Sequence, residues 1–279
     1  MANIYLEEST EHLRSLIQGQ LAEWTRSHSL IVLRPDVFAT RSFDTVVAFL
    51  EARRFRIVGA VSMNFNRNMV REQWRESGLS RVPFVFRALV DFYLSTGQSL
   101  LLLLERSAEG QRSATELLRT LKGPSSPAKR VIGELRGVLG GESALLAFVH
   151  TPDNERAFLL ELGVFLSRPQ RARLLVPLTM GELSKLRDRL YGEVPRHSLS
   201  LAEATQNFQQ ALAASTRDET ERLEARRRLE EILAGDSADP LSELAGLPGA
   251  GSLSDWDLIV LSCRALRDVP FEGAPHSYD

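Results

Sequence analysis

The sequence predicts an α/β fold, a sandwich of the ferredoxin-like type with a four-stranded antiparallel sheet, followed by a helical C-terminal region. The main observation is the order of the patterns: short apolar runs alternate with helical spacing as strand, helix, strand, helical hairpin, strand, helix, strand. The length of 279 residues suffices for one core and an appendage. A composition of 43% hydrophobic and 25% charged residues is typical of a folded protein.

The first elements are an amphipathic helix and a strand. Between Glu7 and Trp24, leucine and isoleucine recur at helical spacing among charges, which predicts one short helix before the main fold. The run SLIVL over 29–33 is β-branched and apolar and stops at Arg34-Pro35-Asp36. We expect a strand that ends in a polar turn.

A helix, a second strand and a helical hairpin follow. Ser42 is expected to cap a helix whose apolar residues recur at i, i+3, i+4 and i+7 over 43–50. The segment 54–65 resumes extended spacing and predicts the second strand. From 68 to 94 the spacing is helical again but is broken near Ser77-Gly78 and Pro83, so we expect two short helices.

The remaining core elements are predicted by apolar runs and by the loop residues that separate them. The leucine run over 100–104 predicts a buried strand, and 113–121 predicts a helix. The glycine, prolines and serines of 123–127 require a loop. An apolar stretch over 143–150 is expected to be the last strand, which ends at a histidine, and 154–165 supplies the closing helix.

Beyond this core the sequence is mainly helical. Helical spacing runs from 180 to 233 with interruptions at Pro195 and 215–216, where Ser215 or Thr216 is expected to cap a helix that stops near Gly235. The Gly-, Pro- and Ser-rich stretch 235–255 is expected to be a linker before a final helix. We therefore predict an N-terminal helical extension, a core domain and a helical C-terminal region, over residues 1–27, 28–168 and 169–279.

Charge, cysteine content and hydropathy exclude several classes of function. With 34 basic and 36 acidic residues, the net charge of −2 gives no electrostatic reason to expect nucleic acid as a partner. The single cysteine, Cys263, lies on an apolar helical pattern and is expected to be buried, and no Cys/His spacing is typical of a zinc site. The longest apolar run, 100–104, is too short to span a membrane, and the acidic N-terminus does not resemble a secretory signal. A cytoplasmic protein without a membrane partner is expected.

Several segments within residues 29–165 resemble the nucleoside diphosphate kinase family, in the family's order and with only small differences in spacing. They are IVLRPD, RFRIVGAVSMNF, REQW, PFVF, LLRTLKGPSSPAKRVIGELRG and AFVHTPDNERAFLLELGVF. The resemblance implies a ferredoxin-like core that binds Mg²⁺ with ATP or another nucleoside triphosphate. It also implies transfer of the γ-phosphate through a phosphohistidine to a diphosphate acceptor, and assembly into homo-oligomers. The metal would be held through the nucleotide phosphates, without a metal site made by the protein.

The same resemblance implies the catalytic residues. His150 matches the phosphate-accepting histidine and is followed by Asp153 at the family's interval, while Glu161 matches the glutamate that orients the imidazole. Arg119 and Arg136 match the two arginines that hold the nucleotide phosphates. These residue types suit the chemistry, because a neutral imidazole is a competent nucleophile and phosphoryl transfer otherwise needs positioning and cationic charge.

Four further positions are implied to bind nucleotide. Ser125 lies where a threonine normally supplies a hydroxyl, and Trp74 lies where the family has a tyrosine near the phosphates. Phe84 or Phe86 is expected to stack on the base. Arg34 replaces the lysine that normally precedes Pro-Asp, and we expect it to neutralise the transferring phosphate.

The residues around the histidine leave three hypotheses for the function open. Ala147 replaces the usual asparagine, and Thr151-Pro152 replaces the usual Gly-Ser. This favours, as an alternative to the phosphotransferase, a catalytically impaired nucleotide-binding regulatory or scaffolding protein that binds a protein partner through its C-terminal helices. A nucleotide-using enzyme with another acceptor is the third hypothesis. The other histidines are expected at the surface: His12, His28, His197 and His276.

Overall fold

The structure is a computed structural model that describes residues 3–17, 20–75, 82–107 and 110–266. Its centre is a four-stranded antiparallel sheet with the strand order β2-β3-β1-β4. The strands are β1 (His28–Leu33), β2 (Arg56–Met63), β3 (Ser99–Glu105) and β4 (Val149–His150). The central pair is in full register, with Ile31 opposite Leu102. The predicted α/β class and the four-stranded antiparallel sheet are confirmed.

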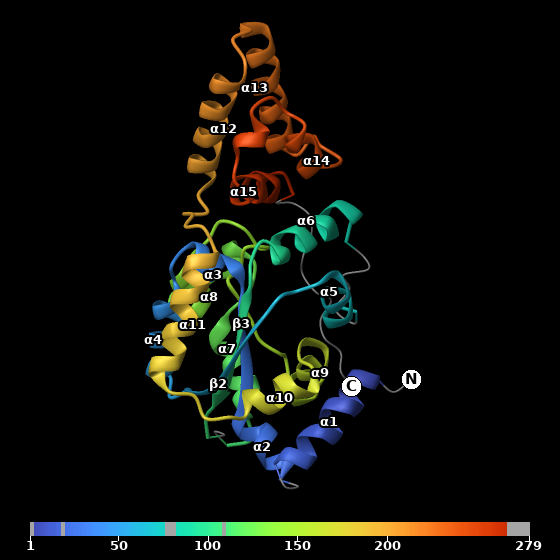
Figure 1. Cartoon of the computed structure of the whole chain (residues 1–279), viewed down its shortest axis with the longest axis vertical. Helices are drawn as coiled ribbons and strands as arrows, with labels where there is room; N and C mark the ends of the chain where they lie inside the picture. Colours follow the sequence, from blue (N-terminus) through green and yellow to red (C-terminus); the bar gives the residue numbers. More distant parts are fainter. Residues whose placement is uncertain (1–2, 18–19, 76–81, 108–109, 267–279) are drawn as a thin grey trace.

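Helices cover the sheet and continue beyond it (Figure 1). In the core, the helices are α3 (Pro35–Ala39), α4 (Phe43–Ala52), α5 (Arg67–Gln73), α6 (Phe84–Ser95), α7 (Ala114–Lys122), α8 (Leu135–Leu139) and α9 (Glu155–Phe165), with the 3-10 turn η2 (Pro127–Lys129). The helices α1 (Ile4–Leu16) and α2 (Leu21–Ser27) lie at one end of the molecule in Figure 1. At the other end lie α12 (Leu201–Ser215), α13 (Glu219–Ala234), α14 (Pro240–Ala245) and α15 (Asp255–Ala265), with η3 (Ala250–Ser252).

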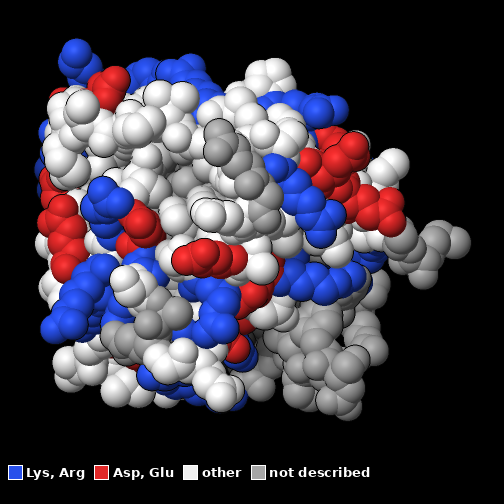
Figure 2. Space-filling model, turned by 90° about the horizontal axis from the view of Figure 1, so that it is seen from below, with Lys and Arg blue, Asp and Glu red and all other residues white. Residues whose placement is uncertain are grey.

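Two more helices, α10 (Arg168–Leu174) and α11 (Met180–Glu193), connect the core to the C-terminal helices along the side of the sheet (Figure 1). On the face seen in Figure 2, basic and acidic side chains lie interspersed among uncharged ones. No helix in the described part of the chain is long and apolar enough to cross a membrane.

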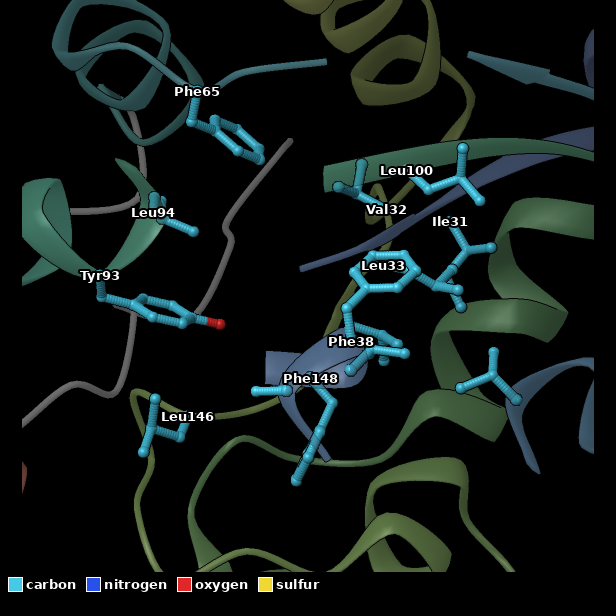
Figure 3. Close-up of a cluster of buried hydrophobic side chains, with 14 of the residues drawn as sticks. Ile31, Val32, Leu33, Phe38, Phe65, Tyr93, Leu94, Leu100, Leu146 and Phe148 are labelled. Atoms are coloured by element: carbon cyan, nitrogen blue, oxygen red, sulfur yellow. The ribbon is translucent and has the colours of Figure 1, made fainter. Parts of the chain in front are cut away.

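The core lies around the two central strands. Residues 30–33 of β1 and 100–104 of β3 are buried on both faces, which explains why their sequences are continuous apolar runs instead of alternating ones. Figure 3 shows Leu33 of β1 and Phe38 of α3 in this cluster, with Phe148 close to Phe38 and Tyr93 of α6 pointing toward them from one side. Burial on this scale fixes the end of β1, and therefore the position of the short strand β4 beside it.

Several predicted elements differ in the structure. The predicted helix over 7–24 is two helices, α1 and α2, and the expected turn at 34–36 is followed by α3, because Pro35 is favourable at a first helical position. Ser42 precedes α4 without capping it, since its hydroxyl lies 2.8 Å from that of Thr40. The predicted strand over 143–150 is regular only at Val149–His150.

The C-terminal region also corrects two predictions. Asp218, not Ser215 or Thr216, caps α13 by accepting from Thr220 and Glu221. The expected linker over 235–255 contains α14, which starts at Pro240 after the capping side chain of Asp239. In both cases an aspartate immediately before the first turn supplies the cap, and at α14 a proline at the first helical position adds to it.

Two histidines expected at the surface are buried. His12 of α1 accepts a hydrogen bond from the buried guanidinium of Arg171, 3.2 Å away. His197 lies 3.1 Å from Asp257 of α15 and accepts from the backbone N–H of Leu199. These side chains tie α1 to α10 and the start of α12 to α15. Cys263 is buried as predicted, and His276 lies outside the described residues.

Candidate active site

The site is built around His150, at the end of β4, where the strand pairs with Val32 of β1. Nε2 of the ring lies 2.9 Å from both carboxylate oxygens of Glu161 in α9. The side chains of His150 and Glu161 are only 13% and 8% exposed. No hydrogen bond within the described part of the chain occupies Nδ1. The carboxylate therefore holds one ring nitrogen and leaves the other for chemistry.

The position of Glu161 follows from the local sequence of α9. Asn154 caps this helix by accepting from the backbone N–H of Ala157 at 2.8 Å. Helix α1 then packs across α9, where the hydroxyl of Ser9 donates to the carbonyl of Leu159 at 2.6 Å. The crossing is so close that a Cβ on Gly163 would come within 2.2 Å of the carbonyl oxygen of Tyr5. The N-terminal extension thus supports the helix that carries the carboxylate.

Two aromatic rings enclose the imidazole. Trp74, which follows α5, lies edge-to-face with it at a centroid distance of 6.3 Å, and Phe165 of α9 does the same at 6.4 Å. The guanidinium of Arg34 lies over the Trp74 ring, 5.6 Å from its centroid. This arrangement orients the imidazole and places a cation near it.

The outer edge of β4 is bound by side chains instead of by another strand. Arg136 of α8 donates to the carbonyls of Ala147 and Val149 at 3.2 and 2.6 Å, and to that of Gly123 at 3.0 Å. Lys122, at the end of α7, donates to the carbonyl of Thr151 at 3.4 Å. The two cations therefore bind the backbone on either side of His150, Arg136 at the carbonyl of the residue before it and Lys122 at that of the residue after it. These contacts satisfy buried acceptors and fix the histidine backbone.

The positions of Lys122 and Arg136 depend on the residues that start and end α7. Ser113 and Glu116 form a capping box that starts α7, and the helix ends at Lys122 before Gly123, whose φ is 78°. A Cβ at Gly123 would also come within 2.4 Å of the Glu134 carboxylate. The glycine is therefore needed for the turn that brings α8 back against β4.

Burial controls the protonation of His150 and Glu161. Desolvation lowers the pKa of His150 well below its usual value, and the charge of Lys122 lowers it further, so the imidazole is neutral at neutral pH. Desolvation and Asp153 raise the pKa of Glu161 well above its usual value, while Lys122 and Arg34 oppose this shift. The cations thus counteract only part of this upward shift, while the 2.9 Å contact with Nε2 places the Glu161 carboxyl where its ionised form would accept the Nε2 proton.

The two buried cations beside the histidine are shifted as well. Burial and the charge of Arg136 lower the pKa of Lys122 to about 7. Burial and the charge of Arg34 lower the pKa of Arg136 to about 9. Positive charge is thus concentrated around His150. Burying these charges has a desolvation cost, which an anion bound beside them would offset.

The other residues predicted to bind phosphate differ in their exposure to solvent. Arg34 is 5% exposed, and its backbone N–H donates to the Phe148 carbonyl at 2.9 Å. Its buried Nε has no hydrogen-bond partner among the residues that the structure describes. Arg119 of α7 is half-exposed and pairs with Asp153 at 3.3 Å. Ser125 lies in the loop after α7, where its carbonyl accepts from Arg130 at 2.7 Å.

The two candidate base-stacking residues are separated by the structure. Phe84 begins α6 and is 67% exposed, whereas Phe86 is buried and lines a cavity of about 190 Å³. Residues 141–146 and helix α15 line the same cavity. No contact within the described part of the chain joins Phe84 or Ser125 to the imidazole, while Trp74 contacts the ring directly. The structure thus groups Glu161 and Trp74 around His150, with Arg34 next to Trp74.

Lys122 is the site residue that the sequence analysis missed. It lies four residues after Leu118 on the buried face of α7. A lysine in the last turn of a helix is usually solvated and favourable to the helix dipole, so the sequence position alone does not predict a buried site. The i, i+4 spacing from a buried leucine was the available signal.

Comparisons with known proteins agree on one family. The family model described as nucleoside diphosphate kinase matches residues 27–170. The nucleoside diphosphate kinase of Archaeoglobus fulgidus is 27% identical over 139 residues, which cover 50% of this chain and 85% of that protein. That of Pyrococcus furiosus is 22% identical over 139 residues, covering 49% and 81%.

Solved structures with partial similarity carry the same description. An NDP kinase from Pyrobaculum aerophilum is 18% identical, with a TM-score of 0.42, and the match covers 53% of this chain and 98% of that one. A halophilic nucleoside diphosphate kinase from Halobacterium salinarum, in complex with CDP, is 19% identical with a TM-score of 0.43, covering 58% and 98%.

Proposed function

Because the chain belongs to the nucleoside diphosphate kinase family, we propose that it moves the γ-phosphate of a nucleoside triphosphate to a diphosphate acceptor through a phosphohistidine at His150. The observation that carries this proposal is the pairing of Nε2 with Glu161 at 2.9 Å. A histidine held at one nitrogen by a carboxylate presents the other nitrogen as the nucleophile.

In the first step, the Nδ1 lone pair attacks the γ-phosphorus. The Nδ1–P bond forms as the bond to the β,γ-bridging oxygen breaks, and the electron pair leaves with the nucleoside diphosphate. Positive charge develops on the imidazole, and the Glu161 carboxylate stabilises it through Nε2–H. A second diphosphate then attacks the phosphohistidine and reverses these changes.

Cationic side chains are assigned to the phosphates. Arg34, whose buried Nε has no hydrogen-bond partner within the described residues, is proposed to bind the transferring group. The half-exposed Arg119 is proposed to bind the nucleotide phosphates. Arg136 uses three of its five N–H groups on backbone carbonyls, so we assign it mainly to positioning β4, with two donors left for phosphate. The magnesium ion bound to the nucleotide adds charge neutralisation.

The remaining contacts follow from the family resemblance. Ser125 is proposed to donate its hydroxyl to a phosphate, and Trp74 to close the site beside the imidazole. The base is proposed to stack on Phe84, whose exposed ring is accessible at the start of α6, with Phe86 as the alternative. Stacking on either ring would tolerate all four bases.

Labelling tests the proposal. Purified protein is incubated with γ-labelled ATP and magnesium and examined for acid-labile, base-stable label. We expect label on wild type and on a His28→Ala control, which alters the opposite end of β1. His150→Ala should carry none. Equal labelling of His150→Ala would refute the proposed nucleophile.

A nucleotide-binding regulatory protein is the second candidate function. Its support is Pro152, which has no backbone N–H, and Thr151, which is 1% exposed and whose buried hydroxyl has no hydrogen-bond partner in the described part of the chain. These residues follow the histidine directly, so they limit the hydrogen bonds that the backbone and side chains there can donate to a phosphate. Measurable ATP binding without any label on His150 would favour this function over transfer.

The division of the chain and its partners are further proposals. We propose a core domain over residues 28–168, flanked by the helical extension 1–27 and the helical region 169–279. Within the last of these, α12 and α13 extend away from the core (Figure 1). They are proposed to bind another protein, and the whole chain to form a homo-oligomer. Light scattering of the full chain measures the assembly, and a monomer mass would refute it.

A further inference from the structure

Lys122 is a buried cation beside the nucleophile that the family resemblance does not account for. It is 9% exposed, and its Nζ lies 3.4 Å from the carbonyl of Thr151, the residue that follows His150. An ammonium group has three N–H donors, and this long hydrogen bond uses one. Two donors therefore remain in the buried space next to the histidine.

This ammonium forms no salt bridge within the described residues, although two carboxylates lie near enough to act on its charge. Glu161 is bound to His150, and Asp153 is bound to Arg119. No ion pair with Lys122 is formed by a carboxylate in the described part of the chain. Burying a lysine without a salt bridge is costly, and ionisable groups with strongly shifted pKa values cluster at functional sites.

The charges that face Lys122 come from four elements of the site. Burial and Arg136 of α8 lower its pKa to about 7, and Arg34 after β1 acts in the same direction. Asp153 after β4 and Glu161 of α9 oppose them. The balance leaves the amine close to its protonation midpoint at neutral pH, so an additional anion in the site would favour the ammonium form.

We propose that Lys122 is a phosphate-binding residue of this site, whose Nζ donors bind oxygens of the phosphoryl group that approaches or occupies Nδ1 of His150. The inference rests on the proposed function, and it adds a cation to Arg34 at the point of transfer. An anion there supplies the salt-bridge partner that Lys122 lacks within the described residues. The amine takes up a proton from solvent as the phosphoryl group arrives and returns it when that group leaves.

The hydrogen bond to Thr151 gives this lysine a second effect. It fixes the backbone directly after the histidine, where Pro152 has no N–H to contribute. The side chain is therefore held, from the end of α7, against the residue that follows the histidine. A purely structural role would need this hydrogen bond alone, whereas phosphate binding needs the charge.

Nucleotide affinity separates the two roles. ATP and ADP binding to the full-length protein are measured by calorimetry for wild type, Lys122→Met and Lys122→Arg. Lys185→Met is the matched control, because Lys185 is exposed on α11. We expect Lys122→Met to bind ATP about tenfold to a hundredfold more weakly, with ADP affinity changed less than about twofold. Lys185→Met should match wild type.

The pH dependence of the preference for ATP over ADP is a measurement that a purely structural role of Lys122 would not affect. The preference of wild type for ATP over ADP should decrease as pH rises above about 7, while Lys122→Arg keeps its preference because arginine stays charged. Unchanged ATP affinity in Lys122→Met, or equal weakening of ATP and ADP, would overturn the proposal. Circular dichroism confirms that each variant is folded.

The same proteins distinguish this inference from the proposed function. If wild type binds ATP but His150 is never labelled, while Lys122→Met selectively weakens ATP binding, transfer is refuted and the phosphate-binding role stands. If wild type is labelled and Lys122→Met keeps both the wild-type labelling rate and the wild-type ATP affinity, transfer stands and the role of Lys122 is refuted. A wild type that binds no ATP refutes both.

Discussion

Both carboxylate oxygens of Glu161 lie 2.9 Å from Nε2 of His150. The contact joins the last residue of β4 to the middle of α9, two elements whose relative position is fixed by the core and by α1 packed on α9. A carboxylate at this distance selects the tautomer with the proton on Nε2 and leaves Nδ1 as a lone-pair donor. This tautomer is the form that phosphoryl transfer through the histidine requires.

Glu161→Gln is expected to slow phosphohistidine formation by about tenfold to a hundredfold without abolishing it. The amide keeps the shape of the side chain but cannot stabilise the charge that develops on the ring. Rapid-quench measurement of label incorporation checks this, with Glu230→Gln on the exposed face of α13 as the control. A wild-type rate in Glu161→Gln would contradict the assigned role.

Substitutions at Arg136 and Arg119 are expected to affect different properties: the first mainly stability, the second mainly nucleotide binding. Arg136→Met leaves three carbonyls without their donor and should lower the free energy of unfolding by about 3 kcal/mol or more. Arg119→Met breaks a half-exposed ion pair and should cost less than about 1 kcal/mol, while it weakens ATP binding. Urea unfolding and calorimetry measure the two quantities. Equal losses of stability would show that Arg136 does not hold β4.

Lys122→Met is also expected to change how stability depends on pH. The pKa of Lys122 is about 7 in the folded protein, against an ordinary value of 10.5. Between these values the unfolded chain binds a proton that the folded chain lacks, so the free energy of unfolding of wild type rises with pH, by about 1.4 kcal/mol per pH unit.

The variant has no such group, so it should be more stable than wild type at and below about pH 7. This advantage should shrink as pH rises toward about 10. Urea unfolding of both proteins at several pH values gives the comparison. A difference in stability that does not change with pH would mean that the buried amine does not titrate in this range.

Gly163→Ala is expected to disturb the packing of α1 on α9. The added Cβ would come within 2.2 Å of the Tyr5 carbonyl oxygen, so the helices must separate, at a cost of about 1–3 kcal/mol. Gly192→Ala in α11 is the matched control, because a Cβ there meets nothing within 4 Å. That change should be neutral or stabilise by up to about 1 kcal/mol. Similar thermal shifts in both variants would be inconsistent with the close crossing.

Most of the fold could be predicted because buried strands and amphipathic helices leave direct patterns in the sequence. The leucine run over 100–104 is continuous because β3 is buried on both faces. The apolar run over 143–150 gave too long a strand, since only Val149 and His150 find ladder partners on β1. Arg136 takes the carbonyls of 147 and 149 instead, and such a long-range contact has no local signal.

The candidate site was predicted only where the family's spacing is kept. His150 and Glu161 were found by their interval, and the structure brings them together. Lys122 was missed because a lysine at the end of a helix normally lies in solvent, and only the tertiary packing of α7 buries it. The same limit applies to His12 and His197, which are buried by partners on distant helices.

Transfer of label from isolated phosphoprotein tests the central claim most directly. Wild type is labelled with γ-labelled ATP, freed of nucleotide, and mixed with an unlabelled nucleoside diphosphate and magnesium. The proposed function predicts that label leaves His150 and appears in the nucleoside triphosphate, and that His150→Ala yields no labelled protein to begin with. Label that stays on the protein, or that is released only as inorganic phosphate, would contradict transfer through His150 to a diphosphate.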